Sequence, residues 1–374
     1  MNPTTEPHQA DLLYSEAEED LRAAVRALLT DRNDPARVAV RAEEGAPYDA
    51  GLWKALAADM GVAGLLVPEE LGGQGASHRE AAVVLEELGR AIAPAPYLTS
   101  AVVATEVLLA CGTGGSAASS LLGDLASGRR TAALVVPFAT GPEALRLPGG
   151  TACMVTAVAD AATADVLLVP STAGLYAVER AEAGVDVAPL VPFDLTRPLA
   201  TVTLTEEAAA AATPLAGAET ALAAVRQGLT AGAGLLASEQ LGLAEWCLEE
   251  TVRYTKERHQ FNRPVGSFQA LKHRMAQLWL EVVSARAAAR NAADSLAAGS
   301  PDAPLAAALA QAYCARVAVH AAEECVQLHG GIGMTWEHPA HLYLKRAKAD
   351  SIALGAPGAH RETVGRLAGL PTPA

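Results

Sequence analysis

Apolar residues recur at helical spacing through about the first 112 positions of the chain. Leu21, Val25 and Leu28–Leu29 fall on one face of a helix, and two later segments, Leu52–Met60 and Arg79–Ile92, repeat the pattern. Amphipathic spacing of this kind is typical of helices that pack one face against a core. The N-terminal part of the chain is therefore predicted to be helical.

The pattern changes near residue 128, where short runs of Val, Leu and Thr are separated by Gly, Pro and Asp. Such runs have the length and composition of strands; they are Thr131–Pro137, Ala152–Val158, Ala164–Val169 and Leu199–Leu204. From about residue 219 the helical pattern returns in long, alanine-rich stretches, with a loop at Gly299–Pro304. We predict a helical domain at 1–130, a β domain at 131–212 and a helical bundle at 213–374.

Composition and charge limit the functions to be considered. The 374 residues are 51% hydrophobic and carry a formal net charge of −14, which is the wrong sign for a broad nucleic-acid surface. No run of about 18 strongly apolar residues is free of charge, so no membrane span is expected. The acidic stretch Met1–Asp20 has no apolar centre and does not have the pattern of a secretory signal.

The cysteines are scattered along the chain and odd in number. None belongs to a Cys-x-x-Cys pair or to a Cys/His ligand spacing, so we expect reduced thiols, a cytoplasmic location and no metal site. The five are Cys111, Cys153, Cys247, Cys314 and Cys325.

The first segment with candidate chemistry is Tyr254–Leu271. Pro264 and Gly266 end the helical pattern, which places Arg258 at or just past a helix C-terminus. One interpretation is a solvated basic turn that complements the helix dipole. The other is a pyrophosphate site in which the guanidinium of Arg258 is a forked donor. The residues alone leave both interpretations open.

The second segment is Gln327–Pro339, where three glycines separate two predicted helices. They could form a tight turn, or they could allow backbone amides to approach a ligand closely. Pro339 is well placed for the first turn of the following helix.

These two segments resemble motifs of the acyl-CoA dehydrogenase family. ERHQFNRPVGSFQALKHRMAQL is similar to the family segment RxQFGxPIxxFQ, and QLHGGIGMTWEHPAHLYLKRAK is similar to QxHGGxGxTxExP. LYSEAEEDLRAAVRALL and GLLVPEELGGQGASHREAAVVLEELGRAIAPAPY resemble the family's opening helices. The resemblance covers almost the whole chain. It implies a mainly α fold with a central small β-barrel domain between a helical N-domain and a C-terminal four-helix bundle.

The resemblance also implies FAD as the cofactor and acyl-CoA or an acyl-carrier-protein thioester as the substrate. In the family the first motif reaches the flavin of a neighbouring subunit, so a homodimer or homotetramer is expected, with an electron-acceptor flavoprotein as a further partner. No nucleic-acid or membrane partner is expected. The residues that would bind FAD are Arg258, Gln260, Phe261, Phe268, Gln269, Gln327, Gly330 and Gly331.

The chain departs from the family at the catalytic base. The usual glutamate position falls at Leu354, and the alternative position near Gly232 also lacks a carboxylate. The threonine that follows in the family is Ala356 here. The resemblance still implies that the backbone N–H of Leu354 polarises the thioester carbonyl.

Desaturation needs a positioned proton acceptor, and Glu239 is the preferred candidate. Its helical neighbours are apolar, so we expect desolvation to raise the pKa of Glu239 toward that of a useful base. The alternative is a structural glutamate bonded to a neighbouring helix. Glu362 is a weaker candidate for the base. A base displaced in this way would meet a carbon pair beyond α,β, such as γ,δ.

By resemblance, Tyr97, Thr99 and Val103 lie on the helix that lines the acyl channel. The bulk of Tyr97 points to a short chain, although a tyrosine packed in a core is the commoner explanation of such a residue. The sequence therefore predicts FAD-dependent desaturation of an acyl thioester. Two alternatives stay open: a non-catalytic partner subunit of a hetero-oligomeric acyl-CoA dehydrogenase, and a related flavin oxidase or monooxygenase.

Overall fold

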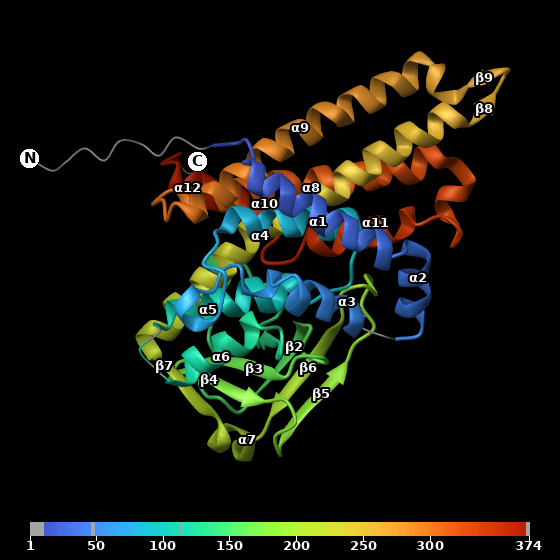
Figure 1. Cartoon of the computed structure of the whole chain (residues 1–374). Helices are drawn as coiled ribbons and strands as arrows, with labels where there is room; N and C mark the ends of the chain where they lie inside the picture. The colour runs from blue at the N-terminus through green and yellow to red at the C-terminus, as the bar shows by residue number, and fades with distance from the viewer. Residues whose placement is uncertain (1–10, 46–48, 113, 115, 372–374) are drawn as a thin grey trace, which may run out of the picture.

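The computed structural model describes residues 11–45, 49–112, 114 and 116–371. The first ten residues of the predicted N-terminal domain lie outside this description. Figure 1 shows the strands of the β domain at one end of the molecule and the long C-terminal helices at the other, with the N-terminal helices packed against both. The order of helical, β and helical parts agrees with the order predicted from the sequence.

The N-terminal part is helical, as predicted. Two of its helices begin at a serine that caps the backbone reciprocally with a glutamate three residues later: Ser15 with Glu18, and Ser77 with Glu80. The helices are α1 (Glu16–Arg32), α2 (Pro35–Glu43), α3 (Ala50–Lys54), α4 (His78–Arg90), α5 (Thr105–Ala110) and α6 (Ser116–Ala126), with π-helical turns η1 (Ala55–Asp59) and η4 (Tyr97–Ala104) and 3-10 turns η2 (Val62–Gly64) and η3 (Glu69–Leu71).

The β domain contains two hydrogen-bonded sheets, of four and three strands, and the described strands do not close into one barrel. The first sheet has the order β1 (Ala132–Leu134), β3 (Val166–Ser171), β4 (Gly174–Glu179), β7 (Thr213–Gly217); the second has β2 (Cys153–Ala159), β6 (Leu199–Leu204), β5 (Val185–Pro189). Only the β1–β3 pair is parallel. The domain also contains η5 (Pro142–Ala144) and α7 (Glu206–Ala211). Strand β7 follows the predicted boundary at residue 212 and completes the first sheet.

The C-terminal part is a bundle built around α8, a helix of 40 residues. Its elements are α8 (Ala218–Glu257), α9 (Gln269–Ala297), α10 (Ala303–His329), α11 (Ala340–Asp350) and α12 (Pro357–Leu367), with 3-10 turns η6 (Val265–Ser267) and η7 (Gly330–Met334). Many of the buried residues of α8, α9 and α10 are alanines, and small side chains let these helices approach closely. The mainly α class with a central β domain is confirmed.

The segment Ala303–Met334, which contains α10, is long and apolar enough to cross a membrane by length and composition alone. However, 61% of its most apolar window is buried inside the protein, because α10 packs against α8, α9, α11 and α12. A central bundle helix needs this apolar character in order to pack on all sides.

Two glycines fix the crossing of α4 and α8. A Cβ atom on Gly242 would lie 1.9 Å from the carbonyl oxygen of Glu86, and one on Gly89 would lie 2.1 Å from the carbonyl oxygen of Glu239. Only glycine allows the two backbones to touch in this way. This crossing anchors α8 at the level of Glu239, where the β domain, α8 and α11 meet.

Candidate functional site

The segment after α8 forms a short hairpin that extends beyond the bundle (Figure 1). Strand β8 (His259–Gln260) pairs with β9 (Arg263–Pro264), and the turn residues Phe261 and Asn262 have φ angles of 52° and 59°. A two-residue turn with positive φ at both positions matches the twist of the strands that it joins. The turn leaves 85% of Phe261 exposed. This hairpin can therefore reach a molecule other than its own bundle.

The predicted cofactor residues of the hairpin segment are available to a ligand. Arg258 caps the C-terminus of α8, its side chain is exposed, and no described carboxylate pairs with it. Gln260 and Gln269 are also exposed. Phe268 is half-buried and packs under the guanidinium of Arg263, at 3.8 Å from the ring centre. An unpaired forked donor beside exposed amides suits an anion such as a pyrophosphate.

The glycine segment presents an open backbone surface at the end of α10. Gly330 has φ 64° and ψ −138°, a backbone conformation that residues other than glycine rarely adopt. A Cβ atom added to Gly330 or Gly331 would meet nothing within 4 Å, so packing within this chain does not explain either glycine. Gln327 is exposed beside them. The segment has room for a ligand or for a partner's cofactor.

The two segments lie at the same end of the bundle. The ring of Tyr254, one turn before Arg258, stacks on the ring of His329 with centroids 4.3 Å apart. The structure thus brings together the residues that the resemblance assigned to FAD, although they are far apart in the sequence. The forked donor suits the phosphates of a dinucleotide cofactor, and the open glycine backbone allows such a cofactor to approach closely.

The usual base position is occupied by a buried leucine whose backbone is already bonded. Leu354 has φ 54°, and its N–H donates to the carbonyl oxygen of Phe138 at 2.7 Å. Positive φ is uncommon for a leucine, so this hydrogen bond and the surrounding packing hold a strained backbone. The expectation that this N–H polarises a thioester carbonyl is wrong for this conformation, because the β domain has taken the donor.

The space beside Leu354 is nearly filled. A cavity of about 20 Å³ lies among the side chains of Thr99, Val103, Phe138, Leu229 and Leu354 and their neighbours. This volume holds about one water molecule and no acyl chain. Thr99 and Val103, which were predicted to line an acyl channel, line this small cavity, and the hydroxyl of Thr99 donates to Asp160 at 2.5 Å.

Gly232 contributes to this closure, whereas Tyr97 does not. A Cβ atom on Gly232 would lie 3.0 Å from Cδ1 of Leu354 and 2.6 Å from Cγ2 of Val103, so glycine at this position gives both side chains room. Tyr97 is 1% exposed, packs in the N-terminal core and does not line the cavity. Its bulk therefore says nothing about acyl chain length.

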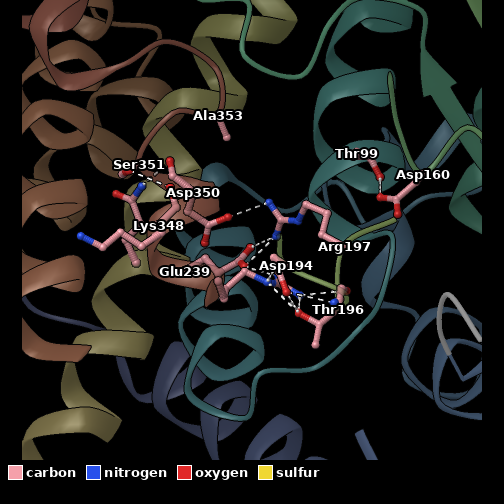
Figure 2. Close-up of polar contacts among 12 residues, drawn as sticks. Thr99, Asp160, Asp194, Thr196, Arg197, Glu239, Lys348, Asp350, Ser351 and Ala353 are labelled. Atoms are coloured by element: carbon pink, nitrogen blue, oxygen red, sulfur yellow. Dashed lines mark hydrogen bonds and ion pairs between the residues drawn. The ribbon is translucent and has the colours of Figure 1, made fainter. Parts of the chain in front are cut away.

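Glu239 is buried, but the expected apolar surroundings are wrong. Its carboxylate accepts hydrogen bonds from Arg197 at 2.6 and 2.8 Å (Figure 2). It also accepts one from Arg346 at 2.6 Å. Burial pushes the pKa of Glu239 upward, but the charges of Arg197 and Arg346 outweigh burial, and the pKa is lowered. A carboxylate held by two arginines is a poor proton acceptor. The alternative of a structural glutamate is the better description.

The same buried cluster contains two more carboxyl groups. Asp194 lies 2.7 Å from Arg346, and Asp350 lies 3.1 Å from Arg197. Burial raises the pKa of Asp350 to about 8, against the opposing charge of Arg197. Three acids facing two arginines carry one negative charge in excess, and burial disfavours the ionised form of Asp350. Arg197 also lies 5.3 Å from the ring centre of Phe138, so the cluster supports the residue that bonds to Leu354.

Glu362, the weaker candidate, lies exposed on α12. Its neighbours Ala359, His360 and Thr363 line a surface cavity of about 130 Å³ with Gly355 and Ala356, but Glu362 does not. Nothing in this arrangement brings its carboxylate to the cavity beside Leu354.

Sequence reasoning missed the cluster around Arg197. Arg346 and Asp350 are one helical turn apart in α11, a spacing that the sequence does reveal. Arg197 comes from the loop between β5 and β6, and only the docking of that loop brings it to Glu239 (Figure 2). No sequence pattern predicts that the carbonyl of Phe138 accepts a hydrogen bond from Leu354.

Models of two protein domains match the chain: the acyl-CoA dehydrogenase N-terminal domain at residues 15–129 and the acyl-CoA dehydrogenase C-terminal domain at residues 222–368. "Acyl-CoA dehydrogenase IpdE2" of Mycolicibacterium smegmatis is 38% identical over 94% of this chain and 98% of that protein.

Two solved structures are similar over nearly the whole chain. The ChsE4-ChsE5 complex from Mycobacterium tuberculosis has a TM-score of 0.84 and 29% identity, covering 97% of this chain and 100% of that one. A variant of the Tcur3481-Tcur3483 steroid ACAD has a TM-score of 0.82 and 28% identity, covering 95% of this chain and 98% of that one.

Proposed function

The chain belongs to the acyl-CoA dehydrogenase family, FAD-dependent oxidoreductases that act on CH–CH groups, and from this premise we propose that it is one subunit of a hetero-oligomeric acyl-CoA dehydrogenase. In this proposal the chain contributes flavin-binding segments, and another chain contributes the catalytic base and the acyl pocket. The substrate is an acyl-CoA, and the electrons pass to an electron-acceptor flavoprotein.

The observation that carries the proposal is the hydrogen bond from the Leu354 N–H to the Phe138 carbonyl, 2.7 Å long. It removes the donor for a thioester carbonyl at the position where the side chain also lacks a carboxylate. The cavity of about 20 Å³ leaves no room for an acyl group beside it. Glu239 is paired with two arginines, and Glu362 is exposed on α12 and lines neither cavity. Neither of the two candidate carboxylates therefore takes the place of the missing base.

The presence of the family's flavin-binding residues supports a role for this chain in binding FAD within the enzyme. When bound, FAD supplies the acceptor for the hydride that leaves the substrate. The guanidinium of Arg258 would bind its phosphates, Gln260 and Phe261 would reach its adenosine side, and the exposed backbone of Gly330 and Gly331 would approach it closely. These groups lie at the tip of the bundle, so they suit a flavin that a neighbouring subunit shares.

The similar structures favour a partner that is a different chain. One of them is a complex of ChsE4 with ChsE5, and the other pairs Tcur3481 with Tcur3483. The second is also described as a steroid ACAD, so a steroid-derived acyl-CoA is the substrate class that we propose to test first.

Two finer predictions lose their support. Oxidation at γ,δ depended on Glu239 acting as a displaced base, and its ion pairs with Arg197 and Arg346 argue against this role. A short acyl chain depended on Tyr97 lining the channel, and Tyr97 lies in the core.

The test is to purify the chain alone and together with a base-bearing acyl-CoA dehydrogenase subunit, and to measure flavin content and anaerobic bleaching by steroid-derived and linear acyl-CoA thioesters. We expect bleaching only with both chains present. Arg258→Gln in this chain should lower the flavin content of the complex, whereas Lys256→Gln, which removes an exposed cation from the same helical turn, should leave it unchanged.

A Leu354→Glu variant tests the chain by itself. If the missing base were the only defect, this variant would gain activity alone. We expect no gain, because the donor N–H and the acyl space are also lost. Stoichiometric flavin and substrate bleaching by the unmodified chain alone would refute the proposal and favour a homo-oligomeric enzyme.

A further inference from the structure

Three polar side chains from distant parts of the sequence converge at the base of the flavin-binding segments. They are Glu250 on α8, His329 at the end of α10, and His338 just before α11. The Nε2 atoms of His329 and His338 lie 3.7 and 3.4 Å from Oε1 of Glu250. One ligand atom from each residue falls within 4.8 Å of the other two. The cluster lies at the opposite end of α8 from the residues around Leu354, and no step of the proposed function uses it.

The hydrogen bonds of His329 leave one ring nitrogen without a partner. Its Nδ1 lies 2.6 Å from the carbonyl oxygen of Cys325, which can only accept, so Nδ1 carries the proton. In the neutral ring Nε2 is then a bare lone pair. This atom is fully buried and has no hydrogen-bond partner. A backbone carbonyl that fixes Nδ1–H in this way is the usual support for a histidine that binds a metal through Nε2.

Nε2 of His329 faces Oε1 of Glu250, which also accepts hydrogen bonds from Arg253 and from Nε2 of His338 at 3.4 Å. The two atoms are 3.7 Å apart, too far for a hydrogen bond, and a cation bound between them, either a proton on Nε2 or a metal ion, relieves the repulsion of their lone pairs. The spacing suits a metal ion, since two ligands bound at about 2.1 Å in a tetrahedron lie roughly 3.4 Å apart. Two of the three ligand pairs already have separations close to this value.

Metal binding would displace weak or replaceable contacts of two ligands. Nδ1 of His338 now accepts a long hydrogen bond of 3.3 Å from the N–H of Ala340, so Nε2 carries the proton and donates to Glu250 at 3.4 Å, and both hydrogen bonds must be given up so that Nε2 can bind a metal. Glu250 also pairs with Arg253, but Arg253 has a second carboxylate, Glu257, at 2.8 Å. None of these contacts is buried deeply enough to block a bound ion.

We propose that Glu250, His329 and His338 form a binding site for a divalent transition-metal ion of the zinc class, with water as the fourth ligand. Two imidazoles and one carboxylate are a ligand set that such ions favour. Glu250 and His338 are partly exposed, which gives an ion access from solvent. The ion joins α8, α10 and the segment before α11, and so stiffens the base from which the Arg258 hairpin and the Gly330–Gly331 turn project. Its role is structural.

The probe is Co²⁺ added to the metal-free full-length chain, because its visible absorption reports coordination geometry. We expect one equivalent to bind with the strong bands of a four-coordinate site, and Zn²⁺ to displace it. Glu250→Gln and His338→Gln should each weaken binding by more than about tenfold, which is a loss that even outer-shell changes can cause. Zn²⁺ should raise the unfolding temperature of the parent protein, but not that of the variants.

The matched control is His320→Gln. His320 is partly exposed and also contacts carboxylates, Glu281 at 2.8 Å and Glu324 at 3.8 Å, but it lies outside the site. Binding that His320→Gln abolishes, or that survives both site variants, would overturn the proposal, as would the absence of a Co²⁺ spectrum. Equal unfolding temperatures of the metal-free proteins verify that the variants fold. The titration needs neither flavin nor a partner, so its outcome is independent of the proposed function.

Discussion

At the scale of single residues, the buried charged side chains next to Phe138 form one connected network of ion pairs. Arg197 joins Glu239 to Asp350, and Arg346 joins Glu239 to Asp194. All five side chains are less than one-tenth exposed. Buried ions are tolerated only when they are paired and hydrogen-bonded. The cluster therefore fixes the position of the loop that carries Arg197 and, through it, that of Phe138.

Replacing Glu239 with glutamine should destabilise the protein by about 3–5 kcal/mol, because Arg197 and Arg346 would lose the carboxylate that they share. Chemical denaturation measures this loss. Glu362→Gln, on the exposed face of α12, is the control and should change stability by less than about 0.5 kcal/mol. Similar stabilities of the two variants would mean that the buried ion pairs contribute little.

Asp350 makes the stability of the protein depend on pH. Its pKa rises from 3.8 in the unfolded chain to about 8 in the fold, so the folded state binds an extra proton between these values. The contribution of Asp350 to the free energy of unfolding is greatest below about pH 4. It is lost as the pH rises toward 8, by at most about 1.4 kcal/mol per pH unit.

Asp350→Asn mimics the protonated acid and should remove this dependence. The variant should gain stability relative to the parent protein as the pH rises from 5 to 9, as measured by denaturant unfolding at each pH. If the parent protein instead became more stable than the variant as the pH rose, Asp350 would be ionised in the folded protein.

At the scale of elements, the hairpin of β8 and β9 is stiff and projecting. Its two positive φ angles and the edge-on packing of Phe261 on Phe268, with ring centres 6.1 Å apart, fix where Arg258 and Gln260 lie. The pairing of Val265 N–H with the Arg258 carbonyl at 2.8 Å closes the base of the hairpin. A preformed binding element loses little entropy when it contacts a ligand.

Arg258→Gln should weaken FAD binding in the assembled enzyme by about 1.5–3 kcal/mol, which corresponds to a charge-assisted hydrogen bond. Titration of the flavin-free complex, followed by flavin fluorescence, measures the change. Lys256→Gln removes an exposed cation from the same helical turn and is the control. An equal loss in both variants would indicate only a general effect of positive charge.

At the scale of the whole molecule, Arg197 connects the β domain to the helical bundle. Its guanidinium reaches Glu239 on α8 and Asp350 on α11 from a loop of the β domain (Figure 2). The Leu354–Phe138 hydrogen bond closes the same boundary. The two contacts together hold the β domain against the place where the family's acyl group would lie.

Arg197→Gln should loosen this boundary without unfolding the protein. Hydrogen exchange should become faster in the loop at 194–198 and at the Leu354 amide, and stay unchanged in the β8–β9 hairpin at the far end of the bundle. Exchange that rises equally in all regions would show global destabilisation and not local opening.

The sequence by itself determined the helices, four of the seven described strands of the β domain, and the flavin-binding motifs. Hydrophobic periodicity, caps and turn glycines are local, so they can be recognised without the fold. Strands β4, β5 and β7 escaped recognition; β5 and β7 are largely exposed and carry little hydrophobic signal. The exposed Arg258 and the Gly330–Gly331 turn lie where the motifs predicted, because each depends on its own helix end.

Only the tertiary structure decided which groups are chemically available. Glu239 looked like a desolvated base because its helical neighbours are apolar, yet its partners Arg197 and Arg346 are 42 and 107 positions away. The N–H of Leu354 looked free because no sequence pattern reveals the carbonyl of Phe138. The pKa of a carboxyl group and the freedom of an amide depend on atoms within a few ångströms, and in a folded chain those atoms come from distant segments.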